Sequence, residues 1–214
     1  FAVDKEEFLK KYRIYETLYI GANFVVYTAM CVFLLPIIQI YTGGITDADY
    51  INPTLILLFT VAKMLSAGKL PASQVVEYSG QFNKTRWHAI CETVINLSLT
   101  VVGILLWGIC GALLGTVAAL AFRTVATLYY TNKKILSRSV MKSVLPLFAN
   151  CAVFAFIYII FGTTHFCDLK FLPLCLHGIL NMLWIVPLYF AANVTVCPEI
   201  LKAIKAKFKK ERTA

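Results

Sequence analysis

The chain has 214 residues, of which 59% are hydrophobic and 14% are charged, and its mean hydropathy is +0.74. A soluble domain averages roughly 45–50% apolar and about 25% charged residues, so this composition excludes an ordinary soluble fold and favours a chain that spans a membrane. In a soluble protein the net charge of +9 would suggest nucleic acid, but here the basic residues lie in short connections between apolar segments, so we expect no nucleic-acid binding.

The apolar residues fall into six segments long enough to cross a membrane as helices, which takes roughly 20 residues each. We therefore predict an all-α integral membrane helical bundle. Residues 1–16 predict a cytoplasmic interfacial helix that runs into the first span, and residues 198–214 predict a basic amphipathic tail at the membrane surface. Residues 69–86 have the composition of a long polar connection. The predicted lobe covers residues 17–197, with spans at about 18–40, 51–68, 87–106, 109–130, 144–161 and 173–196.

The basic residues alternate with the six spans in a way that predicts orientation. All Lys and Arg except Lys63, Arg123 and Lys170 fall in ends and connections that six spans would place on one side. Cytoplasmic segments of membrane proteins carry an excess of Lys and Arg. We therefore expect a multi-pass protein of the cell membrane with both ends of this chain in the cytoplasm.

Three ionisable residues lie inside predicted spans, namely Lys63, Glu92 and Arg123. A charged group inside a membrane is costly and is by default a candidate for function. Counted from the cytoplasmic ends of their spans at 1.5 Å per residue, all three lie at a similar depth of roughly 8–11 Å.

The third span carries a polar stripe, because His88, Glu92, Asn96 and Thr100 recur every four residues. Residues with this spacing share one face of a helix. Facing lipid would leave these polar groups without partners, so we expect the stripe to face another helix.

The fourth span has a matching face of small residues, with Gly111 and Gly115 forming a GxxxG pair on the same side as Arg123. Small residues at this spacing let two membrane helices approach closely. The turn at Trp107-Gly108 is so short that spans three and four are predicted to be antiparallel neighbours, which would bring Glu92 and Arg123 together. Two interpretations stay open: a structural ion pair with Lys63 reaching towards the cytoplasm, or a polar cavity for an anionic substrate.

Motifs of common catalytic sites are missing from the sequence, including the phosphate-binding loop, HExxH and GxSxG. His165, Cys167 and Asp168 are too few for a metal site, and Asp47 and Asp49 fit turn chemistry in an outer connection. We therefore expect a protein that is not an enzyme and that holds no cofactor or metal.

Several segments in order along the chain resemble the C-terminal half of bacterial polysaccharide flippases, which share a superfamily with multidrug and toxin extrusion transporters. The resemblance covers roughly residues 5–140. The segments that carry it are Leu35-Pro36-Ile37-Ile38-Gln39-Ile40-Tyr41-Thr42-Gly43, Lys69-Leu70-Pro71, Ser79-Gly80-Gln81-Phe82-Asn83-Lys84-Thr85, Cys91-Glu92-Thr93-Val94-Ile95-Asn96-Leu97-Ser98-Leu99, Gly108-Ile109-Cys110-Gly111-Ala112-Leu113-Leu114-Gly115-Thr116, Arg123 and Tyr130-Thr131-Asn132-Lys133-Lys134-Ile135-Leu136.

The resemblance implies one lobe of a two-lobed transporter that moves lipid-linked oligosaccharide from the inner to the outer leaflet by alternating access. It further implies that Arg123 and Lys63 meet the anionic pyrophosphate headgroup, with Glu92 and Asn96 as the polar residues that hold them. The expected partners are this lipid-linked substrate, membrane lipids and an N-terminal lobe absent from the sequence, without which the chain should not transport. The alternatives are a cation-coupled multidrug-type exporter, an integral-membrane enzyme of glycan or lipid metabolism, and a non-transporting scaffold.

Overall fold

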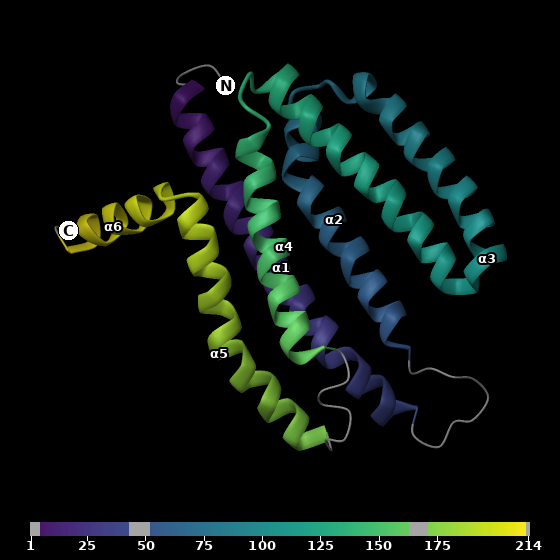
Figure 1. The fold of residues 1–214 in the computed structure, drawn as a ribbon. Helices are drawn as coiled ribbons and strands as arrows, with labels where there is room; N and C mark the ends of the chain where they lie inside the picture. Colours follow the sequence, from purple (N-terminus) through teal and green to yellow (C-terminus); the bar gives the residue numbers. More distant parts are fainter. Residues whose placement is uncertain (1–4, 43–51, 163–170, 213–214) are drawn as a thin grey trace.

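The computed structural model describes residues 5–42, 52–162 and 171–212, and this part of the chain consists of α-helices and one π-helical turn joined by short turns (Figure 1). The predicted all-α class is therefore confirmed. The elements are α1 (Lys5–Tyr41), α2 (Pro53–Tyr78), α3 (Phe82–Tyr130), the π-helical turn η1 (Thr131–Ile135), α4 (Met141–Phe161), α5 (Phe171–Val196) and α6 (Glu199–Arg212).

Within the described residues, five helices are long and apolar enough to cross a membrane, as expected of a multi-pass membrane protein. One of them, α3, reverses its direction at Trp107 and Gly108, whose backbone angles are not helical. Gly108 has a φ of 58°, a conformation that glycine adopts without the steric cost of a Cβ atom. Figure 1 shows α3 as a hairpin of two antiparallel arms, which agrees with the two separate spans that the sequence predicted in this region.

The prediction of a long polar connection over residues 69–86 is wrong. Helix α2 continues to Tyr78, and only residues 79–81 separate it from α3. Its second half keeps buried apolar residues at helical spacing, Ala72, Val75 and Val76 among them, so packing maintains the helix although polar residues occupy its other faces. The connection is a tight turn in which Gly80 adopts a φ of 68°.

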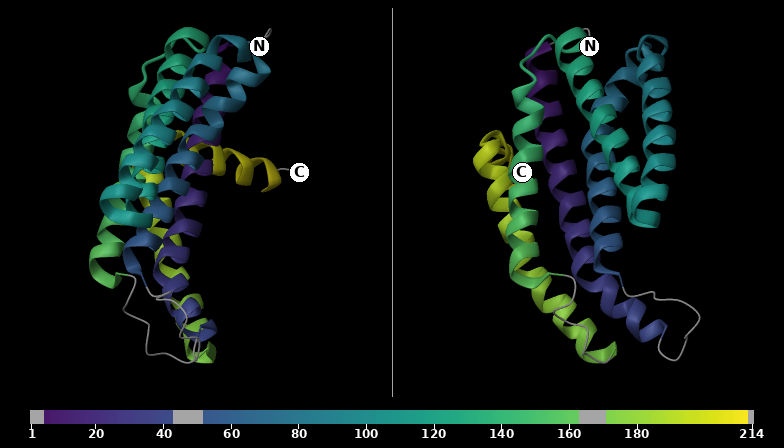
Figure 2. Two further views of the ribbon diagram at one scale, coloured as in Figure 1. Left: turned by 90° about the vertical axis from the view of Figure 1, so that its right-hand side faces the viewer. Right: turned by 45° about the vertical axis from the view of Figure 1, so that its right-hand side comes forward.

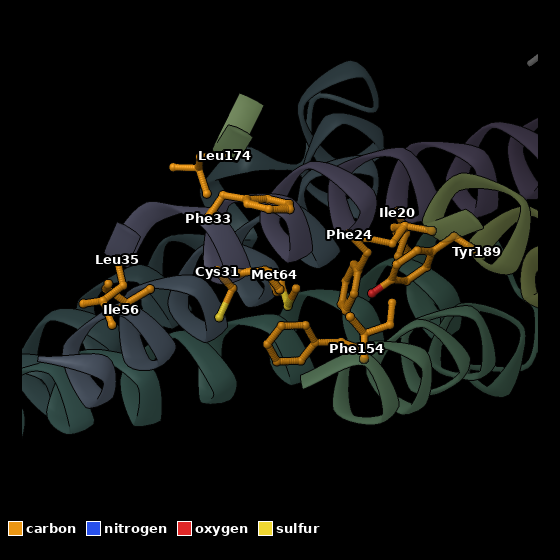
Figure 3. Packing of buried hydrophobic residues seen from close by; sticks show 13 residues of the cluster. Ile20, Phe24, Cys31, Phe33, Leu35, Ile56, Met64, Phe154, Leu174 and Tyr189 are labelled. Carbon is orange, nitrogen blue, oxygen red and sulfur yellow. The ribbon is translucent and has the colours of Figure 1, made fainter. Parts of the chain in front are cut away.

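The main core lies where α1 packs against α2, α4 and α5. Ile20, Phe24, Met64, Phe154 and Tyr189 are among its buried residues (Figure 3). The α3 hairpin packs on α2, at the edge of the bundle away from α5 (Figures 1 and 2). Much of its surface is apolar and exposed, as expected for a helix pair in contact with lipid or with another protein surface.

One fully buried polar layer joins α4 and α5. Asn150 and Asn193 each donate from Nδ2 to the other's Oδ1 at 2.9 Å. A Cβ atom added to Gly21 on α1 would lie 2.5 Å from the Asn193 Nδ2 atom. The amide pair therefore links α4 to α5, and a side chain in place of Gly21 on α1 would have to displace Asn193 from that pair.

The start of α1, the end of α2, both ends of the α3 hairpin and the start of α4 lie together (Figure 1). We call this the basic end of the bundle, because it carries the Lys and Arg residues of residues 5–13, 84–86 and 133–142. Helix α6 leaves α5 at a wide angle and projects away from the bundle (Figure 2), as a helix lying on a membrane surface would. Lys170, Asp47, Asp49, His165, Cys167 and Asp168 lie outside the described residues.

Candidate functional site

The charged residues singled out in spans three and four lie together, as the hairpin predicted. The Glu92 carboxylate is 3.7 Å from Nε of Arg123 on the opposite arm of α3. Its other oxygen is 3.3 Å from Nζ of Lys69 on α2. Arg123 also donates from Nη1 to the Thr85 carbonyl oxygen at 3.3 Å. We call Lys69, Glu92 and Arg123 the ionic cluster; it ties the hairpin to α2.

The ionic cluster has two cations and one carboxylate, so it carries an excess of one positive charge. Its side chains are mostly but not completely buried, with exposed fractions of 16–23%. Sequence reasoning missed Lys69 as a member because it placed that residue in a connection rather than in a helix. Because α2 continues to Tyr78, Lys69 lies within a helix that packs on the hairpin, and its side chain reaches Glu92.

The polar stripe of α3 faces the second arm of the hairpin. The Oδ1 atom of Asn96 accepts hydrogen bonds from the hydroxyls of Thr100 at 3.0 Å and Thr116 at 3.2 Å. The His88 ring packs edge-on against the Tyr130 ring, with centroids 6.0 Å apart. Asn96 therefore links the two arms of the hairpin. Among the described residues, its hydrogen bonds go to Thr100 and Thr116 and not to the ionic cluster.

Gly111 and Gly115 lie where the two arms approach most closely. A Cβ atom on Gly111 would lie 2.8 Å from the Cα atom of Gly103 and would overlap its carbonyl group. A Cβ atom on Gly115 would lie 2.8 Å from the backbone carbonyl carbon of Leu99. The predicted close helix contact is present, and it lies within the hairpin.

Lys63 is not part of the ionic cluster. It is exposed on α2, and the described residues place no carboxylate within ion-pair distance of it. Helical periodicity puts it on the same face of α2 as Leu70 and Glu77, which are also exposed. The structure thus joins Glu92 and Arg123 on α3 and leaves Lys63 on an open face of α2.

A small pocket of about 70 Å³ lies beside Arg123, between α2 and the hairpin. Ser73, Glu77, Thr85 and Thr127 give it polar walls. One water needs roughly 10–15 Å³ of such space, so the pocket holds several waters but not a sugar. Arg123 is therefore accessible to water from the basic end.

A second buried charge pair escaped the sequence analysis. Nη2 of Arg138 lies 2.6 Å from Oε2 of Glu16, and the two side chains are only 4% and 1% exposed. Oγ of Ser143 donates to the other Glu16 oxygen at 2.6 Å. Asn132 bonds to both Arg138 and Ser143, and the guanidinium lies 4.7 Å from the centre of the Tyr12 ring.

This network joins α1, η1 and the start of α4. Arg138 is held in place after η1 by a turn in which Ser137 has a φ of 52°, a left-handed conformation unusual for a residue with a side chain. One signal in the sequence points to Glu16: it follows Phe8 and Tyr12 at four-residue spacing, so it lies on the apolar face of its helix. No local pattern marks Arg138 among the other basic residues near it.

No protein-family model, curated protein sequence or solved structure matches this chain.

Proposed function

We propose that this chain is one lobe of a membrane transporter that moves lipid-linked oligosaccharide from the inner to the outer leaflet of the cell membrane by alternating access. Both ends of the chain face the cytoplasm in this proposal, and a second, N-terminal lobe completes the cavity. The observation that carries the proposal is the ionic cluster, because it offers excess positive charge among membrane-spanning helices.

The chemistry of the substrate explains why such a cluster is useful. A pyrophosphate group cannot enter hydrocarbon without partners for its charges. An arginine guanidinium presents a planar fork that matches phosphate oxygens. The contacts of Glu92 with Lys69 and Arg123 are 3.3 and 3.7 Å long, longer than the roughly 2.7–2.9 Å of a strong charge-assisted hydrogen bond. In our proposal a phosphate displaces Glu92 from the two cations during transport.

Lys63 has a separate role in this proposal. Its face of α2 is exposed, and an exposed lysine within a membrane helix requires a wet or charged environment. We place this face against the cavity shared with the second lobe, where Lys63 attracts the same headgroup. Transporters of this general kind bind substrate between two repeats that rock against each other.

The charge pairing favours an anionic substrate over a cation-coupled export mechanism. A cation-coupled exporter needs a buried carboxylate free to bind a proton, a metal ion or a cationic drug. Among the described residues, Glu16 is buried and Glu92 is mostly buried, and each contacts an arginine. Neither is free in this conformation to bind a second cation.

The test uses the complete transporter reconstituted in liposomes with labelled lipid-linked oligosaccharide. Arg123→Gln and Lys69→Gln remove the two cluster cations one at a time. Lys84→Gln is the matched control, because Lys84 is exposed near the start of α3 and makes no contact with the cluster among the described interactions. We expect each cluster variant to lower the rate of flipping about tenfold or more, as loss of a charged contact to substrate does, and Lys84→Gln to leave it nearly unchanged.

Membrane abundance is measured for every variant alongside the flipping rate. Normal abundance with normal flipping in both cluster variants would refute the proposal. Loss of abundance in Arg123→Gln, Lys69→Gln and Glu92→Gln alike would instead identify the cluster as a structural ion pair.

A further inference from the structure

A second pocket, of about 320 Å³, lies at the basic end between α1, the start of α4 and α6. It is separate from the ionic cluster, which lies between α2 and the hairpin. Its charged lining residues are four cations and two carboxylates: Lys10, Arg13, Arg138, Lys142, Glu6 and Glu199.

The carboxylate of Glu199 is already paired. Arg13 donates from Nη1 to Glu199 Oε1 at 2.8 Å and from Nη2 to the Val196 carbonyl oxygen at 2.9 Å. Burial raises the pKa of Glu199, but hydrogen bonds from its own backbone N–H and from the Cys197 thiol, together with the charge of Arg13, outweigh burial and hold it below its usual value. Glu199 is therefore ionised at neutral pH and positions Arg13 at the pocket.

Arg138 is a largely buried cation in the wall of the pocket. Its Nη2 and Nε atoms bond to Glu16 and Asn132, but its buried Nη1 atom has no hydrogen-bond partner among the described residues. The side chain is 4% exposed, so water does not readily replace the missing acceptor. The small exposed part of the side chain lines the pocket, so Arg138 contributes positive charge to its wall.

The start of α4 adds to this demand for an anion. The start of a helix carries a partial positive charge, although in α4 the N–H groups of Lys142 and Ser143 already donate to the carbonyl oxygens of Ser139 and Val140. The N-cap residue Val140 makes no side-chain capping bond, and the first turn contains no acidic residue. Lys142 lies in that turn instead, where a cation is unfavourable unless an anion is bound nearby.

We propose that this pocket binds a phosphate group, carried by the headgroup of an anionic lipid in the adjoining leaflet or by a soluble phosphate compound. Basic pockets between membrane helices suit phosphate headgroups in this way. The exposed residues Lys10 and Lys142 form its rim, and Arg13 and Arg138 form its deeper wall. The site does not depend on the transport proposal, since it uses none of the ionic cluster.

The test measures binding of short-chain phosphatidylglycerol to the protein in uncharged detergent micelles by native mass spectrometry. Lys10→Gln combined with Lys142→Gln removes two exposed rim charges. Lys133→Gln combined with Lys134→Gln is the matched control: it removes the same charge from exposed residues of η1, which do not line the pocket. We expect saturable binding, weakened about 30-fold in the rim variant and about twofold or less in the control.

Two further ligands identify what is recognised. Phosphatidylcholine, whose headgroup has no net charge, should bind much more weakly than phosphatidylglycerol. Competition by inorganic phosphate would show that the phosphate itself is recognised and that a soluble compound can supply it, whereas absence of competition would identify the lipid as the source. Equal weakening by the two double variants, equal binding of the two lipids, or no saturable binding would overturn the proposal. Circular dichroism checks the fold, and Lys142→Gln alone replaces the double variant if that variant loses helix.

Discussion

The close contact between the arms of the α3 hairpin gives the sharpest test of the fold. In Gly111→Ala, the new methyl group would overlap the backbone carbonyl of Gly103, which cannot move as the end of a flexible side chain can. Overpacking in a protein interior costs about 1–3 kcal/mol and sometimes more. Because both surfaces here are backbone, we expect a loss of at least about 3 kcal/mol in the free energy of unfolding, measured by denaturation with sodium dodecyl sulfate in mixed micelles.

Gly178→Ala is the matched control for this change. Gly178 lies inside α5, and a Cβ atom there has no atom within 4 Å to meet. Replacing glycine by alanine within a helix stabilises it by about 0.5–1 kcal/mol when nothing clashes. The two variants should therefore shift stability in opposite directions. Equal stability of the two variants would show that the arms do not touch at Gly103 and Gly111.

Two other predictions concern charges at the basic end. Glu16→Gln leaves the buried guanidinium of Arg138 without its counter-charge, so we expect it to lower the free energy of unfolding by about 3–5 kcal/mol; a change below about 1 kcal/mol in the same denaturation assay would contradict the buried pair. The pKa of Glu199 is lower in the folded protein than in an unfolded chain. The ionised carboxylate therefore contributes fully to the docking of α6 at any pH above the pKa of the unfolded chain, and this contribution is lost as the pH falls through the pKa of the folded protein. The protection of α6 against hydrogen exchange, relative to the intrinsic rate at each pH, should fall only in that acidic window, and Arg13→Gln should shift the onset of this loss to higher pH; an unchanged onset in that variant would be the contrary result.

Much of the fold could be predicted from local patterns in the sequence. The lengths of the apolar segments indicated six passes, and the turn at Trp107-Gly108 indicated a hairpin. Four-residue spacing placed Glu92 and Arg123 on the faces that meet. These features depend on residues close together in the sequence, for which helical geometry alone fixes which side chains share a face.

The parts that were missed depend on contacts between distant segments. Glu16 and Arg138 are 122 residues apart, and nothing near Arg138 distinguishes it from basic residues that face water. Lys69 was assigned to a connection because the segment 69–86 is rich in polar residues, whereas packing of Val75 and Val76 keeps its first part helical. Tertiary packing overrode local composition in both cases.

The two charge networks differ in ways that favour different roles. The Glu16–Arg138 contact is 2.6 Å long and almost completely buried, and its carboxylate also accepts a hydrogen bond from Ser143. In the ionic cluster the contacts are longer and the side chains more exposed. A pair that is short and dry, with both carboxylate oxygens of Glu16 hydrogen-bonded, is suited to fixing α1 against α4, since breaking it strands a buried charge. A cluster that is looser, partly wet and short of one negative charge can exchange its carboxylate for another anion at lower cost, which is what binding and release of a phosphate would require.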